Sequence, residues 1–237
     1  MSWSGVSNSM KSIWWKLKRA LFNVVVQISN RLFGKEIIHR SVIAGWLNKK
    51  WLDLVEVLSP ARRRQSRFER DNPAEPWFVP AAITYIEGQL RSDFSGFEWG
   101  CGRSTFWFAR RVHHITSVEG RREWFDDVSL CLVNDELREK ITLHLAEVTT
   151  EHDFIQKEIE NYVGAINDVV DGSLDFIVID GHFRDACLQR IGNKLRPGGL
   201  LIIDNSEVVQ KSLLDGLNKK TIKAWNNGIW ETTVIHW

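Results

Sequence analysis

The stretch FSGFEWGCGRST, residues 94–105, decides the fold that the sequence predicts. An apolar, strand-like segment ends in the carboxylate of Glu98, and two glycines, Gly100 and Gly102, follow one residue apart. The hydroxyl pair Ser104-Thr105 can then open a helix. Glycines in such a strand–turn–helix unit permit a sharp turn and bring a ligand close to the backbone, and the helix N-terminus offers free N–H groups. We therefore expect this loop to bind a nucleotide-type cofactor.

The chain after residue 78 alternates short apolar runs with helical periodicity. We expect a helix at 78–90 and further helices at 104–112, 121–134, 184–194 and near 207–217. Strands are expected at 94–99, 115–118, 141–145, 174–179 and 199–203, and a closing hairpin at 221–225 and 230–235. This alternation predicts an α/β fold with a Rossmann-like, doubly wound, mostly parallel sheet that helices cover on both faces.

Charge divides the chain into two parts. Residues 1–70 contain 14 Lys and Arg against 4 Asp and Glu, whereas residues 71–237 contain 17 and 26. Apolar residues recur at helical spacing over 11–33 and 41–58, and an exposed basic linker is expected at 61–67. We therefore expect a basic helical extension over 1–70 and a catalytic-type domain over 71–237.

The basic extension has two interpretations. It packs on the acidic remainder of the protein, or helix 11–33, with Trp14 and Trp15, lies on an anionic membrane surface. No uncharged run approaches the roughly 20 residues that cross a bilayer, and Cys101, Cys131 and Cys187 show no metal-ligand or CxxC spacing. We expect a cytoplasmic protein without a nucleic-acid partner, and peripheral contact with the inner membrane face if the second interpretation holds.

Acidic residues end strand after strand. Ligands of open parallel sheets bind beyond the carboxyl ends of the strands, and those ends are Glu98, Glu119, Ala146-Glu147, Asp180 and Asp204. Glu119 lies at the end of the second strand, about 20 residues past the first strand end, where an acidic side chain can accept hydrogen bonds from a ribose diol. The alternative for Glu119 is a surface residue that begins a turn at Gly120.

The loop lacks the third glycine of a dinucleotide fingerprint, because Thr105 stands there. Four motifs together resemble the class I methyltransferases that use S-adenosylmethionine (SAM). They cover residues 76–237 and are Glu98-Trp99-Gly100-Cys101-Gly102, Val118-Glu119, Ile179-Asp180-Gly181 and Leu195-Arg196-Pro197-Gly198-Gly199. The resemblance implies a sheet of about seven strands with an antiparallel last strand.

The same resemblance implies site roles. Glu98, Gly100 and Gly102 would hold the methionine part of SAM, and Glu119 would bind its ribose. Ala146 and Glu147 would lie by the adenine, and Asp180 would face the reaction centre.

A narrower resemblance concerns the metal-dependent O-methyltransferases of the catechol type. Asp180 and the pair Asp204-Asn205 match the positions that hold a divalent ion there, and three oxygen ligands suit Mg²⁺. That family has a lysine where this chain has Phe183. His182 and Arg184 lie beside this position, and His182 could be a general base. The alternative is that Asp204-Asn205 only caps the next helix or contacts substrate.

These observations predict a SAM-dependent methyltransferase that methylates an oxygen of a small molecule or of a glycan- or lipid-type acceptor. Asp180, His182 and Asp204 are its expected catalytic residues. Two alternatives stay open: an NAD-dependent oxidoreductase, and a non-catalytic nucleotide-binding module anchored through its N-terminal helices.

Overall fold

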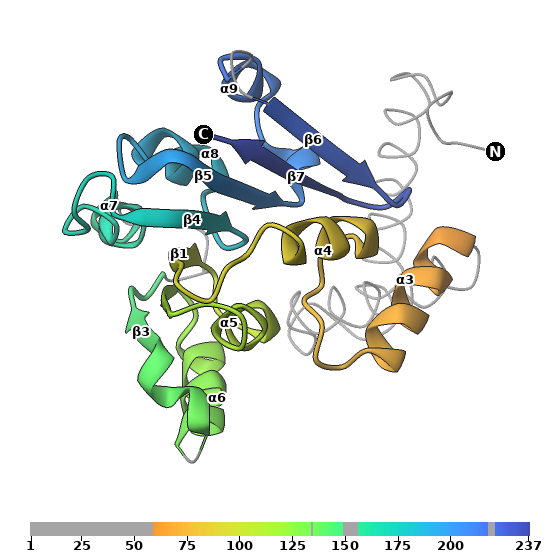
Figure 1. The fold of residues 1–237 in the computed structure, drawn as a ribbon, viewed down its shortest axis with the longest axis horizontal. Helices are drawn as coiled ribbons and strands as arrows, with labels where there is room; N and C mark the ends of the chain where they lie inside the picture. The colour runs from red at the N-terminus through yellow and green to blue at the C-terminus, as the bar shows by residue number, and fades with distance from the viewer. Residues whose placement is uncertain (1–58, 134, 149–155, 218–220) are drawn as a thin grey trace, which may run out of the picture. The chain divides into compact units, whose positions relative to one another are not determined.

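The computed structural model describes residues 59–133, 135–148, 156–217 and 221–237 (Figure 1). The chain divides into two compact units, Met1–Arg64 and Gln65–Trp237. The helices expected at 11–33 and 41–58 lie outside the described residues. The second unit contains the sheet, and helix α3 (Pro60–Asp71) begins just before this unit in sequence.

Seven strands form one sheet in the order β3-β2-β1-β4-β5-β7-β6. Only β7 runs antiparallel to its neighbours, β5 and β6, as the resemblance implied. The predicted Rossmann-like fold with about seven strands is therefore confirmed. The strand bounds are β1 Ser95–Trp99, β2 His114–Glu119, β3 Ile141–Leu145, β4 Leu174–Ile179, β5 Leu195–Asp204, β6 Thr221–Asn226 and β7 Glu231–His236.

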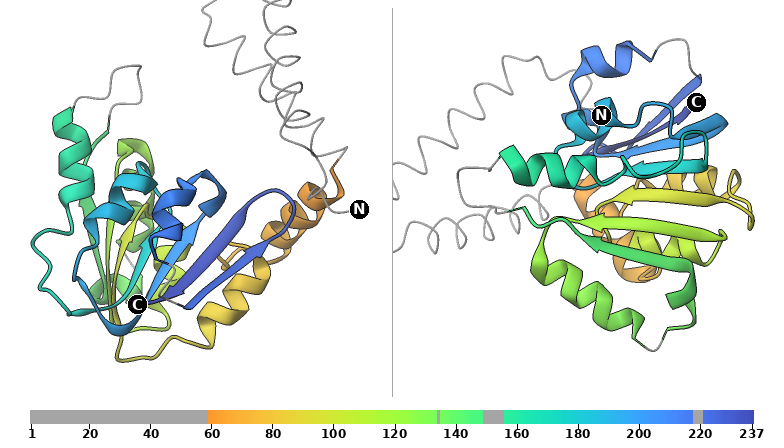
Figure 2. Two further views of the ribbon diagram at one scale, coloured as in Figure 1. Left: turned by 90° about the horizontal axis from the view of Figure 1, so that it is seen from above. Right: turned by 90° about the vertical axis from the view of Figure 1, so that its left-hand side faces the viewer.

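Helices cover both faces of this sheet (Figure 2). Successive β4 side chains show why: Phe176 and Val178 pack into one apolar core, while Ile177 and Ile179 pack into the other. Side chains of a strand alternate between faces, so a wholly apolar run suits a strand buried on both sides. The helices are α4 Pro80–Glu87, α5 Arg103–Ala109, α6 Arg122–Leu132, α7 Gln156–Gly164, α8 Arg184–Arg190 and α9 Lys211–Asp215, with 3₁₀ turns at η2 Glu136–Lys140 and η3 Ser206–Val208.

The predicted basic linker at 61–67 is wrong, because these residues belong to helix α3. Proline is tolerated in the first turn of a helix, so Pro60 does not prevent this start. Gln65 is only 4% exposed, and its side-chain oxygen accepts a hydrogen bond from Asn227 Nδ2 at 2.9 Å. The second half of α3 therefore packs into the same unit as the sheet.

Two further differences concern loops. Helix α7 occupies a connection in which no helix is predicted from local pattern. The fifth strand was expected to begin at Gly199, but β5 begins at Leu195, so Pro197 and Gly198 lie inside it. Leu174 pairs with Leu195 and Phe176 pairs with Leu200, and β5 bulges between these two pairs. Gly198 has a φ of +80°, which permits the bend.

The strand order places the site. The chain moves outward from β1 through β2 to β3 and then returns to β4 on the other side of β1. Ligands of open α/β sheets bind in the crevice at such a topological switch point. The carboxyl ends of β1, β2 and β4 meet there.

Candidate active site

A cavity of about 470 Å³ opens at the switch point. It combines the glycine loop after β1 with residues that follow β2 and β4. Its lining consists of Trp77, Gly100, Cys101, Gly102, Arg103, Ser104, Glu119, Arg121, Trp124, Asp180, Gly181, His182 and Arg184.

Gly100 sits where the loops after β1 and β4 approach most closely. Its φ is +95°, and a Cβ atom there would lie 2.8 Å from the backbone nitrogen of Gly181. Its N–H donates to the Val118 carbonyl at 2.8 Å, so the turn is also tied to β2. Only glycine fits this position without moving either loop.

Glu98 lies beneath the loop and does not line the cavity. It is fully buried, and its carboxylate accepts hydrogen bonds from Ser104 Oγ at 2.5 Å, Thr105 Oγ1 at 2.6 Å and Ser117 Oγ at 2.7 Å. Burial raises the pKa of Glu98 to about 7, although these three donors act against the rise. This arrangement ties the first turn of α5 to β1 and β2.

Thr105 explains why the loop has no third glycine. Its hydroxyl oxygen accepts a hydrogen bond from the Gly102 N–H at 3.0 Å while the same hydroxyl donates to Glu98. A glycine at this position would leave the Gly102 N–H without that partner. The threonine therefore fixes the loop from below.

Glu119 ends β2 and does reach the cavity. It is 5% exposed, and its oxygens accept hydrogen bonds from the backbone N–H groups of Cys101 at 3.1 Å and Arg121 at 2.8 Å. Each carboxylate oxygen offers two acceptor sites, so Glu119 can still accept hydrogen bonds from a diol in the cavity.

Ala146 and Glu147 follow β3 but are not among the lining residues. The Ala146 N–H donates to the Glu119 carbonyl at 2.9 Å, and Glu147 forms a half-exposed ion pair with Arg122 at 3.2 Å. Their expected place by an adenine ring stays a prediction. Residues 149–155, which come next, lie outside the described part of the chain.

The four residues expected at the reaction centre separate into two groups. Asp180 and His182, which follow β4, line the cavity. Asp204 is 3% exposed, accepts a hydrogen bond from Thr232 Oγ1 at 2.7 Å and is not part of the lining, and neither is Asn205. Only the first pair can therefore meet a ligand in the cavity directly as the structure stands.

The titration of these groups follows their surroundings. Burial raises the pKa of Asp180 to about 7, against the effect of the neighbouring Arg184 guanidinium. Burial raises the pKa of Asp204 to about 8, and the nearby Asp180 charge acts in the same direction. Burial lowers the pKa of His182, which favours its neutral imidazole.

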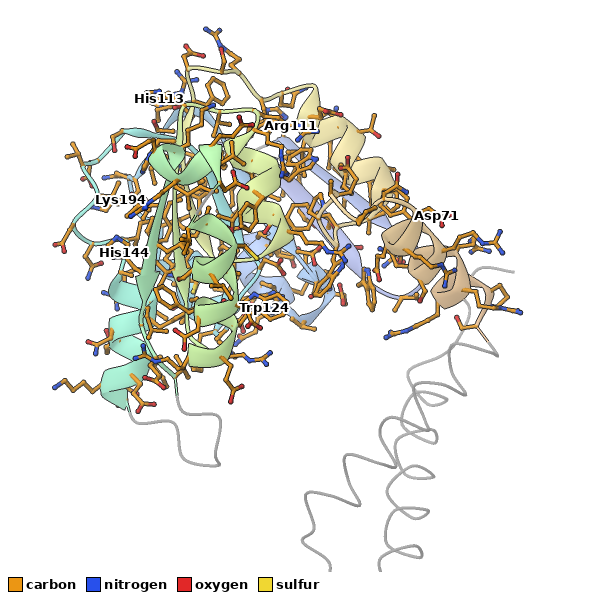
Figure 3. All side chains as sticks on the ribbon, turned by 90° about the horizontal axis from the view of Figure 1, so that it is seen from below. Asp71, Arg111, His113, Trp124, His144 and Lys194 are labelled. Carbon is orange, nitrogen blue, oxygen red and sulfur yellow. The ribbon has the colours of Figure 1, made fainter. Side chains whose placement is uncertain are left out.

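Sequence reasoning missed the aromatic and basic wall of the cavity. Trp77 and Trp124 lie with ring centroids 6.2 Å apart, and the Arg103 guanidinium lies 5.4 Å from the Trp77 ring centroid. Trp124 Nε1 donates to the Cys101 carbonyl at 2.5 Å. Figure 3 labels Trp124 beside helix α6, well away from His113, which precedes β2. The sequence does contain one signal for Trp124. This residue lies five positions after Glu119, in the first turn of the helix that follows β2, and therefore near the end of the sheet where ligands bind.

The sheet order, the glycine turn and a buried carboxylate at the end of β2 define a Rossmann-like domain that binds a nucleoside-type cofactor. The cavity fits the donor SAM chemically: a backbone turn approaches it closely at Gly100, and Glu119 offers acceptor oxygens for a ribose.

Comparison with known proteins identifies the class. Residues 97–206 match the model of a family described as a methyltransferase domain, whereas no curated protein matches the chain. A methyltransferase-like protein from Silicibacter pomeroyi has a similar fold, with a TM-score of 0.52 and 18% identity over 68% of this chain and 88% of that one. A methyltransferase from Geobacter sulfurreducens gives a TM-score of 0.49 and 15% identity over 83% and 96%.

Identities this low concern the fold alone, so the family match carries the identification. The match over residues 97–206, together with the sheet order, identifies a methyltransferase domain of the class I, SAM-dependent type. The family implies SAM as the methyl donor, in place of the nicotinamide dinucleotide of the alternative interpretation.

Proposed function

We propose that this methyltransferase transfers the methyl group to an oxygen atom of a small molecule or of a glycan- or lipid-type acceptor. The observation that carries the proposal is that His182 and the Asp180 carboxyl both line the cavity that contains the glycine loop. Hydroxyl acceptors need a group that removes their proton, and both side chains can do so.

Three groups of residues would bind or support SAM in one half of the cavity. The backbone of Gly100 and Gly102 approaches the methionine part, and Glu119 accepts hydrogen bonds from the ribose hydroxyls. Glu98 acts from behind the loop by fixing Ser104 and Thr105, so we assign it a positioning role. When bound, SAM supplies an electrophilic methyl group on a positively charged sulfur.

The acceptor half would provide the base. In the transfer, an oxygen lone pair forms the new C–O bond, the electron pair of the C–S bond stays on sulfur, and the hydroxyl proton passes to the His182 imidazole. A lowered histidine pKa keeps that imidazole unprotonated at neutral pH. Asp180 is the second candidate to hold the proton. Proximity and orientation of the two reactants would supply most of the rate acceleration.

Calorimetry with the product S-adenosylhomocysteine (SAH) and with NADH tests the cofactor assignment. We expect SAH to bind the wild-type protein and to bind Glu119→Ala at least tenfold more weakly. Asp127→Ala, an exposed acidic residue of α6 outside the cavity lining, is the matched control and should bind SAH normally. Binding of NADH without binding of SAH would overturn the assignment.

The acceptor is tested separately by mass spectrometry of hydroxylated small molecules, glycans and lipids incubated with the enzyme and methyl-labelled SAM. We expect label in a methyl ether or ester, and a loss of at least 100-fold in its rate of formation with His182→Ala. Label that appears only on nitrogen or carbon would contradict the proposal while leaving SAH binding intact.

A further inference from the structure

Arg184 holds an unusual position between two strand ends. It is the first residue of α8, and its guanidinium is bonded to the turns after both β4 and β5. Nε donates to the Asp204 carbonyl at 2.8 Å, and Nη1 donates to the Gly181 carbonyl at 2.9 Å. Nη2 donates to the Asp180 carbonyl at 3.0 Å, to Asp180 Oδ1 at 3.2 Å and to Asn205 Oδ1 at 2.9 Å.

The backbone around this guanidinium is also unusual. Phe183 and Asn205 are the non-glycine residues with positive φ in the described part of the chain, at 52° and 49°. One precedes Arg184 in sequence and the other contacts its side chain. Left-handed backbone costs a bulky residue such as phenylalanine about 1–2 kcal/mol, so it persists where the surroundings enforce it. Both turns are shaped around one cation.

A divalent ion does not fit the same oxygens. Asp180 Oδ1 and Asn205 Oδ1, two of the expected metal ligands, both accept from Arg184 Nη2. The third, Asp204, accepts from Thr232 and is buried away from the cavity. Mg²⁺ needs oxygens at about 2.0–2.1 Å in an octahedron, and a dication placed between these oxygens would meet the guanidinium.

We infer that Arg184 is the acceptor-side cation of this enzyme and takes the place that a divalent metal holds in catechol-type O-methyltransferases. The inference rests on the proposed transfer to oxygen. Arg184 lines the cavity, and its side chain is 19% exposed. A guanidinium has five N–H groups, and one N–H of Nη1 has no protein partner among the described residues. That N–H is the donor for the acceptor oxygen.

This role sets the class of acceptor. A fixed guanidinium lowers the pKa of a hydroxyl bound to it and prefers an oxygen that carries negative charge. One N–H contacts one oxygen, whereas a metal ion can bind both oxygens of a chelating diol. The acceptor therefore has a single acidic hydroxyl or a carboxylate at the reacting position rather than a metal-chelating diol.

Titration with Mn²⁺ alone, followed by its electron paramagnetic resonance signal in the presence of saturating SAH, tests the inference. We expect the full-length wild-type protein to bind no Mn²⁺ at 1:1 stoichiometry in the micromolar range. Arg184→Ala, which frees the Asp180 and Asn205 oxygens, should bind Mn²⁺ at least tenfold more tightly than wild type. Arg184→Lys keeps a cation and should resemble wild type.

A saturable 1:1 Mn²⁺ site in the wild-type protein that is lost in an Asp180→Asn variant still able to bind SAH would overturn the inference. SAH calorimetry on the same samples separates the two levels of the argument. Failure of SAH to bind wild type would contradict the proposed function, whereas SAH binding together with a wild-type Mn²⁺ site would contradict only the role of Arg184.

Discussion

Thr105 shows at the scale of one residue how the loop is built. Its hydroxyl both accepts from Gly102 and donates to Glu98, so Thr105→Val removes two hydrogen bonds with little change in shape. We expect the variant to lose about 1–3 kcal/mol of unfolding free energy, because the buried Gly102 N–H and a Glu98 oxygen each lose a partner. Its affinity for SAH should fall about tenfold.

Urea denaturation and SAH calorimetry measure both effects. Thr84→Val is the control, because Thr84 is exposed and makes a single weak contact of 3.4 Å with the Pro80 carbonyl. Equal stability of the two variants would show that Thr105 does not fix the loop.

The raised pKa of the buried Asp204 carboxyl predicts how the stability of the protein changes with pH. Burial and the Asp180 charge raise its pKa from an ordinary value near 4 to about 8. A raised carboxyl pKa means that the protonated form stabilises the fold. That contribution is complete below about pH 4 and is lost as the pH rises through about 8. The wild-type protein should therefore lose stability between pH 6 and pH 9.

Asp204→Asn should remove part of this loss, because asparagine stays neutral and can still accept from Thr232. For wild type we expect the free energy of unfolding to be about 1–3 kcal/mol lower at pH 9 than at pH 6, since each pKa unit corresponds to about 1.4 kcal/mol. The difference should be smaller for Asp204→Asn. Urea denaturation at the two pH values measures it. The same slope in both proteins would show that Asp204 titrates normally.

At the scale of elements, the turns after β1 and β4 are in close contact at Gly100 and Gly181. Gly100→Ala would place a methyl group 2.8 Å from the Gly181 nitrogen and force the two turns apart. Gly198→Ala is the matched control, because Gly198 also has a positive φ but a Cβ there would meet nothing within 4 Å. Both variants pay about 1–2 kcal/mol for the left-handed backbone.

Only Gly100→Ala should lose substantially more stability than that and abolish measurable SAH binding. Differential scanning calorimetry and SAH titration of the two variants provide the comparison. If Gly100→Ala bound SAH as tightly as Gly198→Ala does, the turn could not be the cofactor loop.

The elements also show what the sequence can and cannot predict. The β4 run Leu174–Ile179 and the acidic strand ends follow from local pattern, and they located Glu119, Asp180 and His182 at the cavity. The partners of Arg184 come from turns about 20 residues apart, which meet only because β4 pairs with β5. Such contacts depend on strand order and are absent from local periodicity.

Two predictions from local sequence pattern were wrong because contacts between residues distant in sequence determine the structure there. The arginine run of α3 resembles a solvated linker, yet Gln65 within it is held by Asn227 across the fold. The Pro-Gly-Gly segment resembles a turn that precedes a strand, yet pairing of Leu195 with Leu174 extends β5 beyond it. In both cases tertiary contacts decide the structure.

At the scale of the whole molecule, charge is the feature that the folded unit does not explain. Residues 1–70 contain 14 Lys and Arg and 4 Asp and Glu. In the described part of the chain no helix is long and apolar enough to span a bilayer. For residues 11–33 the sequence predicts electrostatic attraction to an anionic surface, with Trp14 and Trp15 at the interface.

Flotation with vesicles of phosphatidylserine and phosphatidylcholine tests this mode. We expect the full-length protein to float at low salt and to stay at the bottom of the gradient at 0.5 M salt, because screening shortens the reach of surface charges to a few ångströms. A full-length variant in which four basic residues become glutamate should not float even at low salt: Lys11, Lys16, Lys18 and Arg19.

The variant must first bind SAH as wild type does, which shows that the catalytic unit is intact. If it floats equally well, these four residues do not hold the protein at the membrane. If wild type fails to float on anionic vesicles at low salt, the basic extension has a different partner, and packing on the acidic part of the chain becomes the favoured interpretation.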